Sequence, residues 1–179
     1  FLYHNNALDL YNIHQCCNSY TMTNLIANGN MENLSVPDGF SENSSILFSI
    51  TGAPYDGYYM VAPQKEIYTV KEFNCVSGEK YYISGMIYPA NNNATGIAVD
   101  SLNNTQHLLF SQSIFSDYYT WHKISGVFTI DYETTFRVLL GTPYAGGIDT
   151  TCCVDNVVMI NLTQTFGAGN EPSKEWCDK

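Results

Sequence analysis

Short stretches of alternating apolar and polar residues, separated by turn residues, constrain the fold of this 179-residue chain more than any other feature. In residues 134–140, Phe136, Val138 and Leu140 fall on one face and Thr135 and Arg137 on the other, as in a β-strand with one buried face. Further candidate strands are residues 45–51, 57–62, 66–73, 80–88, 95–102, 107–115, 121–131 and 152–161. Gly, Pro and Asn residues separate them, and the sequence shows no long amphipathic helix. The series predicts an all-β fold, an antiparallel β-sandwich.

The two ends of the chain do not follow this pattern. Residues 1–23 have neither clean alternation nor helical periodicity, and we expect a connector or a short helical lead-in there. Residues 163–179 contain a Gly-rich turn, FGAGNEP, and Pro172 is expected at the first position of a short helix. The expected division is therefore a lead-in (1–23), a sandwich domain (24–162) and a C-terminal turn and helix (163–179). Because the chain begins with Phe, we also expect it to be part of a longer protein.

The last predicted strand, CCVDNVVMIN (152–161), contains a carboxylate among β-branched residues. Strict alternation places its apolar residues on both faces: Val154, Val158 and Ile160 on one, and Val157 and Met159 on the other, beside Asp155. Apolar residues on both faces favour a strand inside the sandwich. A buried carboxylate is costly unless a hydrogen-bond donor or a cation meets it. We therefore expect Asp155 to have a partner, in the segment that opens the sandwich.

Composition narrows the possible partners. The chain has 7 basic and 17 acidic residues, a net charge of −10, which argues against nucleic acids and anionic membranes. No apolar run is long enough for a membrane span, and the N-terminus lacks the features of a signal peptide. Neutral polymers remain possible ligands. The six cysteines form two vicinal pairs and two single residues, without the C-x-x-C spacing of a zinc or redox site. Their even number permits disulfides, but a chain of this size favours free, mostly buried thiols.

Four segments carry a resemblance to a known family: NLIANGNMEN (24–33), GEKYYISGMIY (78–88), WHKISGVFTI (121–130) and CCVDNVVMIN (152–161). In this order they resemble the jelly-roll carbohydrate-binding modules of the galactose-binding-like type. The ending, LTQTFGAGNEPSKEWCDK, is similar to a segment that follows such a jelly roll in bacteriophage tail and fibre proteins and in prophage-encoded surface proteins. The resemblance implies a jelly-roll fold and binding of carbohydrate.

The resemblance also implies a structural calcium ion where the first and last strands meet. Glu32 and Asp155 would supply side-chain ligands, with Asn30 nearby. Calcium prefers several oxygen ligands in a flexible geometry, which carboxylates from both ends of the domain would provide. The alternative is that both carboxylates accept hydrogen bonds from backbone N–H groups. Met31 stands where the family has Phe, a departure that leaves these residues in place.

Candidate sugar contacts are aromatic residues in loops, because an aromatic ring stacks on the apolar face of a pyranose. They are Tyr55, Tyr58, Tyr59, Tyr118 and Tyr144. Half-buried tyrosines with a purely structural role are the more common case in such loops. Trp121 is expected at an edge of the core.

The sequence contains no G-x-S-x-G, H-E-x-x-H, phosphate-binding glycine loop or C-x-x-C motif, so no enzymatic activity is predicted. We predict a non-catalytic module of a bacteriophage tail fibre or other virion appendage that contacts host-surface glycan and neighbouring copies in the fibre. One alternative is a structural spacer or decoration domain that binds only its neighbours. Another is an accessory module of a secreted or cell-surface bacterial glycosidase.

Overall fold

The computed structural model describes residues 11–15, 18–33, 35, 37–38, 40, 45–48, 55–63, 67–68, 73–89, 95–101, 104–114, 116–132, 135–141 and 152–179. Its strands are β1 (Tyr11–Gln15), β2 (Asn18–Met22), β3 (Ser45–Phe48), β4 (Met60–Pro63), β5 (Ile67–Tyr68), β6 (Phe73–Asn74), β7 (Lys80–Pro89), β8 (Thr95–Ser101), β9 (Asn104–Ile114), β10 (His122–Thr129), β11 (Thr135–Gly141) and β12 (Cys152–Asn161). Two short helices follow, α1 (Leu162–Phe166) and α2 (Lys174–Cys177). None of the described helices is long and apolar enough to cross a membrane.

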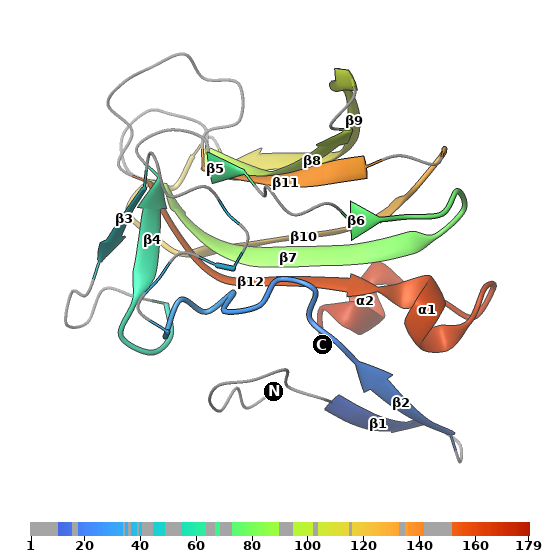
Figure 1. The fold of residues 1–179 in the computed structure, drawn as a ribbon. Coiled ribbons are helices and arrows are strands. Elements are labelled where there is room, and N and C mark those ends of the chain that lie inside the picture. The colour runs from blue at the N-terminus through green and yellow to red at the C-terminus, as the bar shows by residue number, and fades with distance from the viewer. Residues whose placement is uncertain are drawn as a thin grey trace.

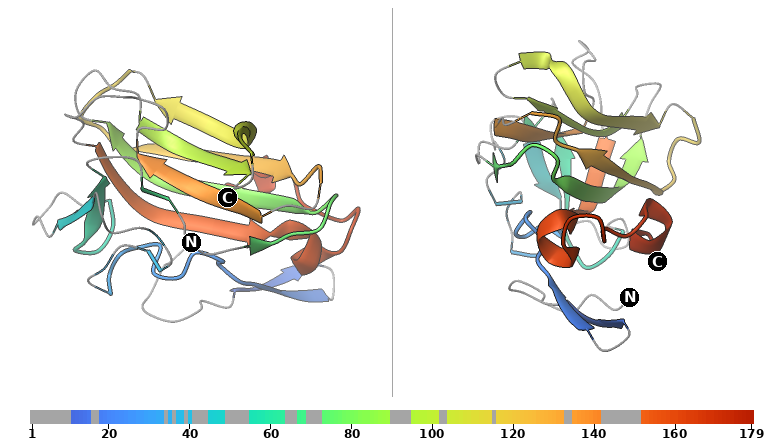
Figure 2. Two further views of the ribbon diagram at one scale, coloured as in Figure 1. Left: turned by 45° about the horizontal axis from the view of Figure 1, so that its top comes forward. Right: turned by 90° about the vertical axis from the view of Figure 1, so that its right-hand side faces the viewer.

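The strands form two antiparallel sheets that lie one over the other (Figure 1). The first sheet has the order β10-β7-β12-β4-β3, and the second has the order β5-β11-β8-β9, with β6 beside β11. The hairpin β1-β2 lies outside these two layers (Figure 2). The predicted fold class, an antiparallel β-sandwich with a short C-terminal turn and helix, is confirmed.

The core lies between the two sheets, and the predicted alternation of β11 is confirmed by burial of Phe136, Val138 and Leu140. Aromatic rings fill its centre: Phe73 stacks on Phe136 with centroids 4.8 Å apart, and Tyr81 stacks on Phe128 at 5.5 Å. Such ring pairs contribute packing beyond the area that they bury.

The buried hydroxyl of Tyr81 is satisfied within the protein. It donates to Glu79 Oε2 at 2.8 Å and accepts from Asn161 Nδ2 at 2.9 Å. Burial raises the pKa of Glu79, but hydrogen bonds from Val76 N–H, Gln164, Tyr81 and Asn161 outweigh it, so this pKa lies below its usual value. The polar groups of this end of the core therefore form one connected network.

The N-terminal region contains a hairpin. β1 and β2 pair from Tyr11↔Met22 to Gln15↔Asn18, so the helical alternative expected for residues 1–23 is wrong for these strands. The strand conformation is supported by a tertiary contact, because the Tyr20 ring packs against Phe166 of α1 with centroids 4.8 Å apart. Residues 1–10, 16 and 17 lie outside the described residues. The three-part division of the chain stays a prediction.

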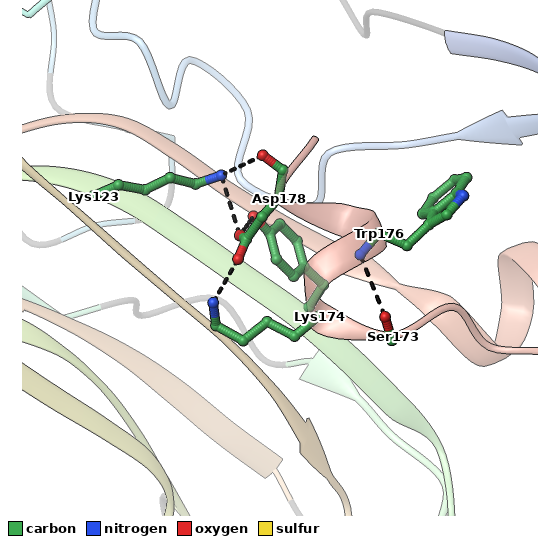
Figure 3. Close-up of polar contacts among 6 residues, drawn as sticks. Lys123, Ser173, Lys174, Trp176 and Asp178 are labelled. Carbon is green, nitrogen blue, oxygen red and sulfur yellow. Dashed lines mark hydrogen bonds and ion pairs between the residues drawn. The ribbon is translucent and has the colours of Figure 1, made fainter.

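The C-terminal segment begins with a helix that the alternation pattern did not predict. Asn161 caps α1 by accepting a hydrogen bond from Gln164 N–H at 2.9 Å, a typical N-cap interaction. The second helix was predicted to have Pro172 at its first position, and this is wrong by two residues. Ser173 is the N-cap, its hydroxyl accepting from Trp176 N–H at 3.3 Å, and α2 starts at Lys174 (Figure 3).

The Gly-rich turn between the helices is closed by Glu171. Its carboxylate accepts hydrogen bonds from Thr163 Oγ1 (2.8 Å) and Gly169 N–H (2.9 Å) and an ion pair from Lys80 Nζ (3.3 Å). Gly167 and Gly169 both have positive φ, 86° and 83°, which glycine adopts at little cost. Glu171 thus fastens the C-terminal segment to Lys80 at the start of β7.

Three cysteines support the predicted free-thiol state. Cys75, Cys153 and Cys177 are free, and burial raises the pKa of Cys153 to about 11. A thiol with so high a pKa is a weak nucleophile at neutral pH. Cys16 and Cys17, and the side chain of Cys152, lie outside the described part of the chain.

Candidate functional site

The N-terminal segment 24–33 lies along β12 in the first sheet. Leu25 N–H donates to Met159 O at 2.7 Å, and Val157 N–H donates to Gly29 O at 2.8 Å. The Asn24 side chain adds two further bonds, accepting from Met159 N–H at 2.9 Å and donating to Val157 O at 3.1 Å. A Cβ at Gly29 would lie 2.0 Å from the Val157 carbonyl oxygen, so this close approach requires glycine.

Next to this contact β12 contains a β-bulge. Asn156 has φ 49°, and the pairing with β7 shifts between Asp155↔Met86 and Val158↔Ser84. Strict alternation predicted Val154 on the face opposite Val157 and Met159, and this is wrong, because all three are buried in the core. The extra residue resets the alternation.

The bulge also changes the position expected for Asp155. It pairs with Met86, while Val158 and Ile160 pair with Ser84 and Tyr82 on the same face of β7. Asp155 therefore lies with Val158 and Ile160 on the outer face of the first sheet, not beside Val157 and Met159 as predicted.

The carboxylates of Glu32 and Asp155 both bind the loop before β4. Glu32 Oε1 accepts hydrogen bonds from Tyr58 N–H and Tyr59 N–H, each at 2.8 Å. Asp155 Oδ2 accepts from Asp56 N–H at 3.2 Å, and Asp155 Oδ1 accepts from Asn156 N–H at 2.7 Å. The donors to Asp155 therefore lie in this loop and in β12 itself, so the partner expected in the opening segment is wrong; Glu32 of that segment binds the same loop instead. Hydrogen bonding to backbone N–H groups, the alternative to calcium, occurs at both carboxylates.

Gly57 lets the loop wrap around Glu32. It has φ 66°, and a Cβ there would lie 2.4 Å from the carboxylate carbon of Glu32. Residues 55–59 therefore form a concave turn of backbone amides around a carboxylate, a common anion-binding geometry. We call residues 55–59 the Tyr55–Tyr59 loop.

Asp155 has an unusual charge environment. Its side chain is fully buried, and burial together with the nearby Glu32 carboxylate raises its pKa to about 7 despite hydrogen bonds from backbone N–H groups. The two carboxylates repel each other, and a cation between them would relieve that repulsion.

The residues present fit a calcium ion in their chemistry. Glu32 Oε1 already accepts two N–H bonds, so Oε2 would be the Glu32 oxygen that binds a metal, together with the remaining acceptor capacity of the Asp155 carboxylate. Asn30 Oδ1 lies 3.5 Å from Glu32 N, next to the pair. Within the described residues no group of three or more His, Cys, Asp or Glu side chains gathers, so further ligands would be amide, carbonyl or water oxygens.

The Tyr55–Tyr59 loop brings aromatic residues to one end of the sandwich. The rings of Tyr55 and Trp121 meet edge to face with centroids 5.9 Å apart. The Tyr88 ring also contacts the Trp121 ring, with centroids 5.3 Å apart. Tyr55 is 51% exposed and Tyr58 is 74% exposed. We call Tyr55, Tyr58, Tyr88 and Trp121 the aromatic end.

The other predicted sugar contacts differ in their environment. Tyr59 is half-buried and packs against the core, so its ring is not presented to solvent as a platform. Tyr118 is half-buried in the turn before β10, where the next residue, Tyr119, is 61% exposed and donates its N–H to Pro89 O. Tyr144 lies outside the described residues.

Sequence reasoning identified Tyr55 and Tyr58 but missed Tyr88, which looked like one more residue of a regular strand. It also missed the connection between the two sets of predictions. The two suspected metal ligands hold the loop that carries the suspected sugar contacts. Residues 28–30 (NGN) and 154–156 (VDN) indicated that the opening segment meets the last strand. Nothing in the sequence linked either segment to the Tyr55–Tyr59 loop.

Comparison with solved structures finds the same fold in carbohydrate-binding modules. A family 16 carbohydrate-binding module matches with a TM-score of 0.54 and 16% identity, covering 77% of this chain and 100% of the module. A family 61 module solved in complex with β-1,4-galactotriose matches with a TM-score of 0.52 and 12% identity, covering 77% and 98%. No protein-family model and no curated protein matches the sequence. At these identities the comparisons establish the fold, a jelly-roll sandwich.

Proposed function

We propose that this chain is a non-catalytic glycan-binding module and that its aromatic end contacts the sugar. The observation that carries the proposal is the pair of exposed tyrosines, Tyr55 and Tyr58, held on a loop that two carboxylates fix in place. Fixed aromatic rings bind sugars well because little conformational entropy is lost on binding. The shared fold with modules such as the one bound to β-1,4-galactotriose supports the same function.

Charge limits the glycan class. With a net charge of −10, the chain repels polyanionic polysaccharides and favours neutral ones. We further propose that the module belongs to a bacteriophage tail fibre or other virion appendage and contacts host-surface glycan. That part of the proposal is supported by the resemblance of residues 162–179 to the ending found in such proteins.

The experiment is binding of the purified chain to an array of bacterial surface polysaccharides and neutral oligosaccharides. Wild type is compared with Tyr55→Ala and Tyr58→Ala. The matched control is Tyr132→Ala, an exposed tyrosine that follows β10 at the end opposite to Trp121. We expect selective binding that both loop variants weaken at least tenfold and the control leaves unchanged. Equal binding by all four proteins, or no binding to any glycan, would refute the proposal.

We also propose a structural calcium ion held by Glu32 and Asp155, with Asn30 nearby. A ligand that binds only the native state raises the melting midpoint, by about 2.7 kcal/mol of stability at a concentration 100 times its Kd. The midpoint should therefore be higher in calcium than in chelator, and magnesium at equal ionic strength should have a much smaller effect. Asp155→Asn should abolish the difference. Equal midpoints for wild type in calcium and in chelator would remove the ion from the site.

A further inference from the structure

A cavity of about 450 Å³ lies against the outer face of the first sheet. Its floor is formed by side chains that alternate along β7, Tyr82, Ser84 and Met86, beside Val158 of β12. The N-terminal segment 24–33 forms one wall, and residues 177–179 form another. The volume falls within the range of small-molecule sites, about 300–1,000 Å³.

Four charged side chains line the cavity: Lys123 and Asp178 pair with each other, and Asp38 and Lys179 add one negative and one positive charge. Asp178 Oδ1 pairs with Lys123 Nζ at 3.1 Å and accepts from the Tyr82 hydroxyl at 2.8 Å, and its other oxygen pairs with Lys174 (Figure 3). Lys123 Nζ also donates to the Asp178 carbonyl oxygen at 3.2 Å. Because the cation and the carboxylate are already paired, this end of the cavity offers little attraction to a charged ligand.

The remaining lining combines an apolar floor with amide and hydroxyl groups. Met86, Val158 and Ile160 supply the apolar surface, and asparagines of the segment 24–33 line the opposite wall. A saccharide presents the same two kinds of surface, apolar C–H faces and hydroxyl groups. The lining therefore fits a short neutral saccharide better than a phosphate or a lipid chain.

Tyr55 links the cavity to the aromatic end. It lines the cavity, and its ring also contacts Trp121, 5.9 Å between centroids. We propose that the cavity binds the terminal residues of a neutral glycan whose following residues lie on the aromatic end. This inference rests on the proposed function, and it means that the module recognises the ends of glycans rather than their internal segments.

The methionines provide a direct test. Of the five in the chain, Met22 and Met86 line the cavity, while Met31, Met60 and Met159 are buried in the sandwich. In protein labelled with ¹³C at the methionine methyl groups, β-1,4-galactotriose, xylohexaose and short fragments of any array-positive polysaccharide are titrated. A parallel titration follows Trp121 fluorescence in a Trp176→Phe background, which removes the second of the two tryptophans.

We expect a saccharide that changes Trp121 fluorescence to shift the Met22 and Met86 methyl signals with the same saturation curve, and to leave the other three unchanged. Val158→Phe, which fills the cavity, should weaken binding at least tenfold. Val76→Phe, an exposed position distant from the cavity lining, is the matched control. The three core methyl signals report whether each variant is folded.

The outcomes separate the two proposals. A saccharide that changes Trp121 fluorescence and leaves Met22 and Met86 unshifted would overturn the cavity inference while the glycan-binding function stands. A saccharide that shifts the two methyl signals and leaves Trp121 unchanged would place binding in the cavity and remove the aromatic end from the proposed function. Saccharides that change neither signal would refute both.

Discussion

Gly57→Ala is the sharpest test of how the Tyr55–Tyr59 loop is held, because it removes no aromatic ring and no carboxylate. Gly57 has φ 66°, and the new Cβ would lie 2.4 Å from the Glu32 carboxylate carbon. Either the loop or the flexible Glu32 side chain must move away, and in both cases the hydrogen bonds from Tyr58 N–H and Tyr59 N–H to Glu32 break.

The expected cost has two parts. An L-residue in the left-handed region costs about 1 kcal/mol. Hydrogen bonds to a charged group contribute about 1.5–3 kcal/mol each. Glu32 is half-exposed, so water replaces much of what is lost, and we take about 2 kcal/mol for the pair. The sum is about 3 kcal/mol, a fall in melting midpoint of about 6–12 °C for a chain of this size.

Gly78→Ala is the matched control. Gly78 also has positive φ, 90°, but an added Cβ there meets nothing within 4 Å. It should show only the backbone cost, about 1 kcal/mol or about 2–4 °C. Thermal melts followed by circular dichroism measure both, and glycan binding is compared at a temperature where both variants are folded. Equal losses of stability for the two variants, with equal binding, would refute the role given to Glu32.

Two further predictions concern the C-terminal segment. Asn161→Ala removes the N-cap of α1 and the hydrogen bond to the Tyr81 hydroxyl. The free energy of unfolding, measured with denaturant, should fall by about 2 kcal/mol, of which about 1 kcal/mol is the cap. A fall of less than about 0.5 kcal/mol would contradict both contacts. Burial raises the pKa of Asp178, but hydrogen bonds from Lys174, Ser125, Tyr82 and Lys123 outweigh it and hold this pKa below its usual value. The stability that Asp178 contributes is therefore present above the unfolded-state pKa, about 3.9, and is lost as the pH falls below it. Melting midpoints should fall more steeply below pH 4 in wild type than in Asp178→Asn, and parallel curves would refute this.

Most of the sandwich could be predicted from the sequence because local pattern and tertiary packing agree. Phe136, Val138 and Leu140 of β11 all point into the core, so alternation alone found the strand and its buried face. The bulge at Asn156 could not be found in this way, since one extra residue reverses every face after it without changing the composition of the strand. Asn adopts a positive φ more readily than most other residues, but the chain contains many Asn residues and the sequence did not single out Asn156.

The residues of the candidate site were predicted separately, without the loop that joins them. Glu32 and Asp155 follow from the resemblance, and Tyr55 and Tyr58 from exposure expected in loops. The loop that joins them depends on backbone N–H groups, which every residue has and no side-chain pattern reveals. The start of α1 could have been predicted, because Asn161 is a favoured N-cap residue. The β-branched residues before it predicted only that the strand ends there.

The pairing of the N-terminal segment with β12 also has a consequence for folding kinetics. The bond from Asn24 Nδ2 to Val157 O joins residues 133 positions apart, and such non-local contacts form late because the intervening chain must first be ordered. The Tyr55–Tyr59 loop can bind both Glu32 and Asp155 only when this closure is complete. A folding intermediate could have both sheets in place and still lack the fixed Tyr55–Tyr59 loop. Recovery of glycan affinity should then lag behind recovery of β-structure, and a nascent chain would stay unable to bind until its last strand had been made.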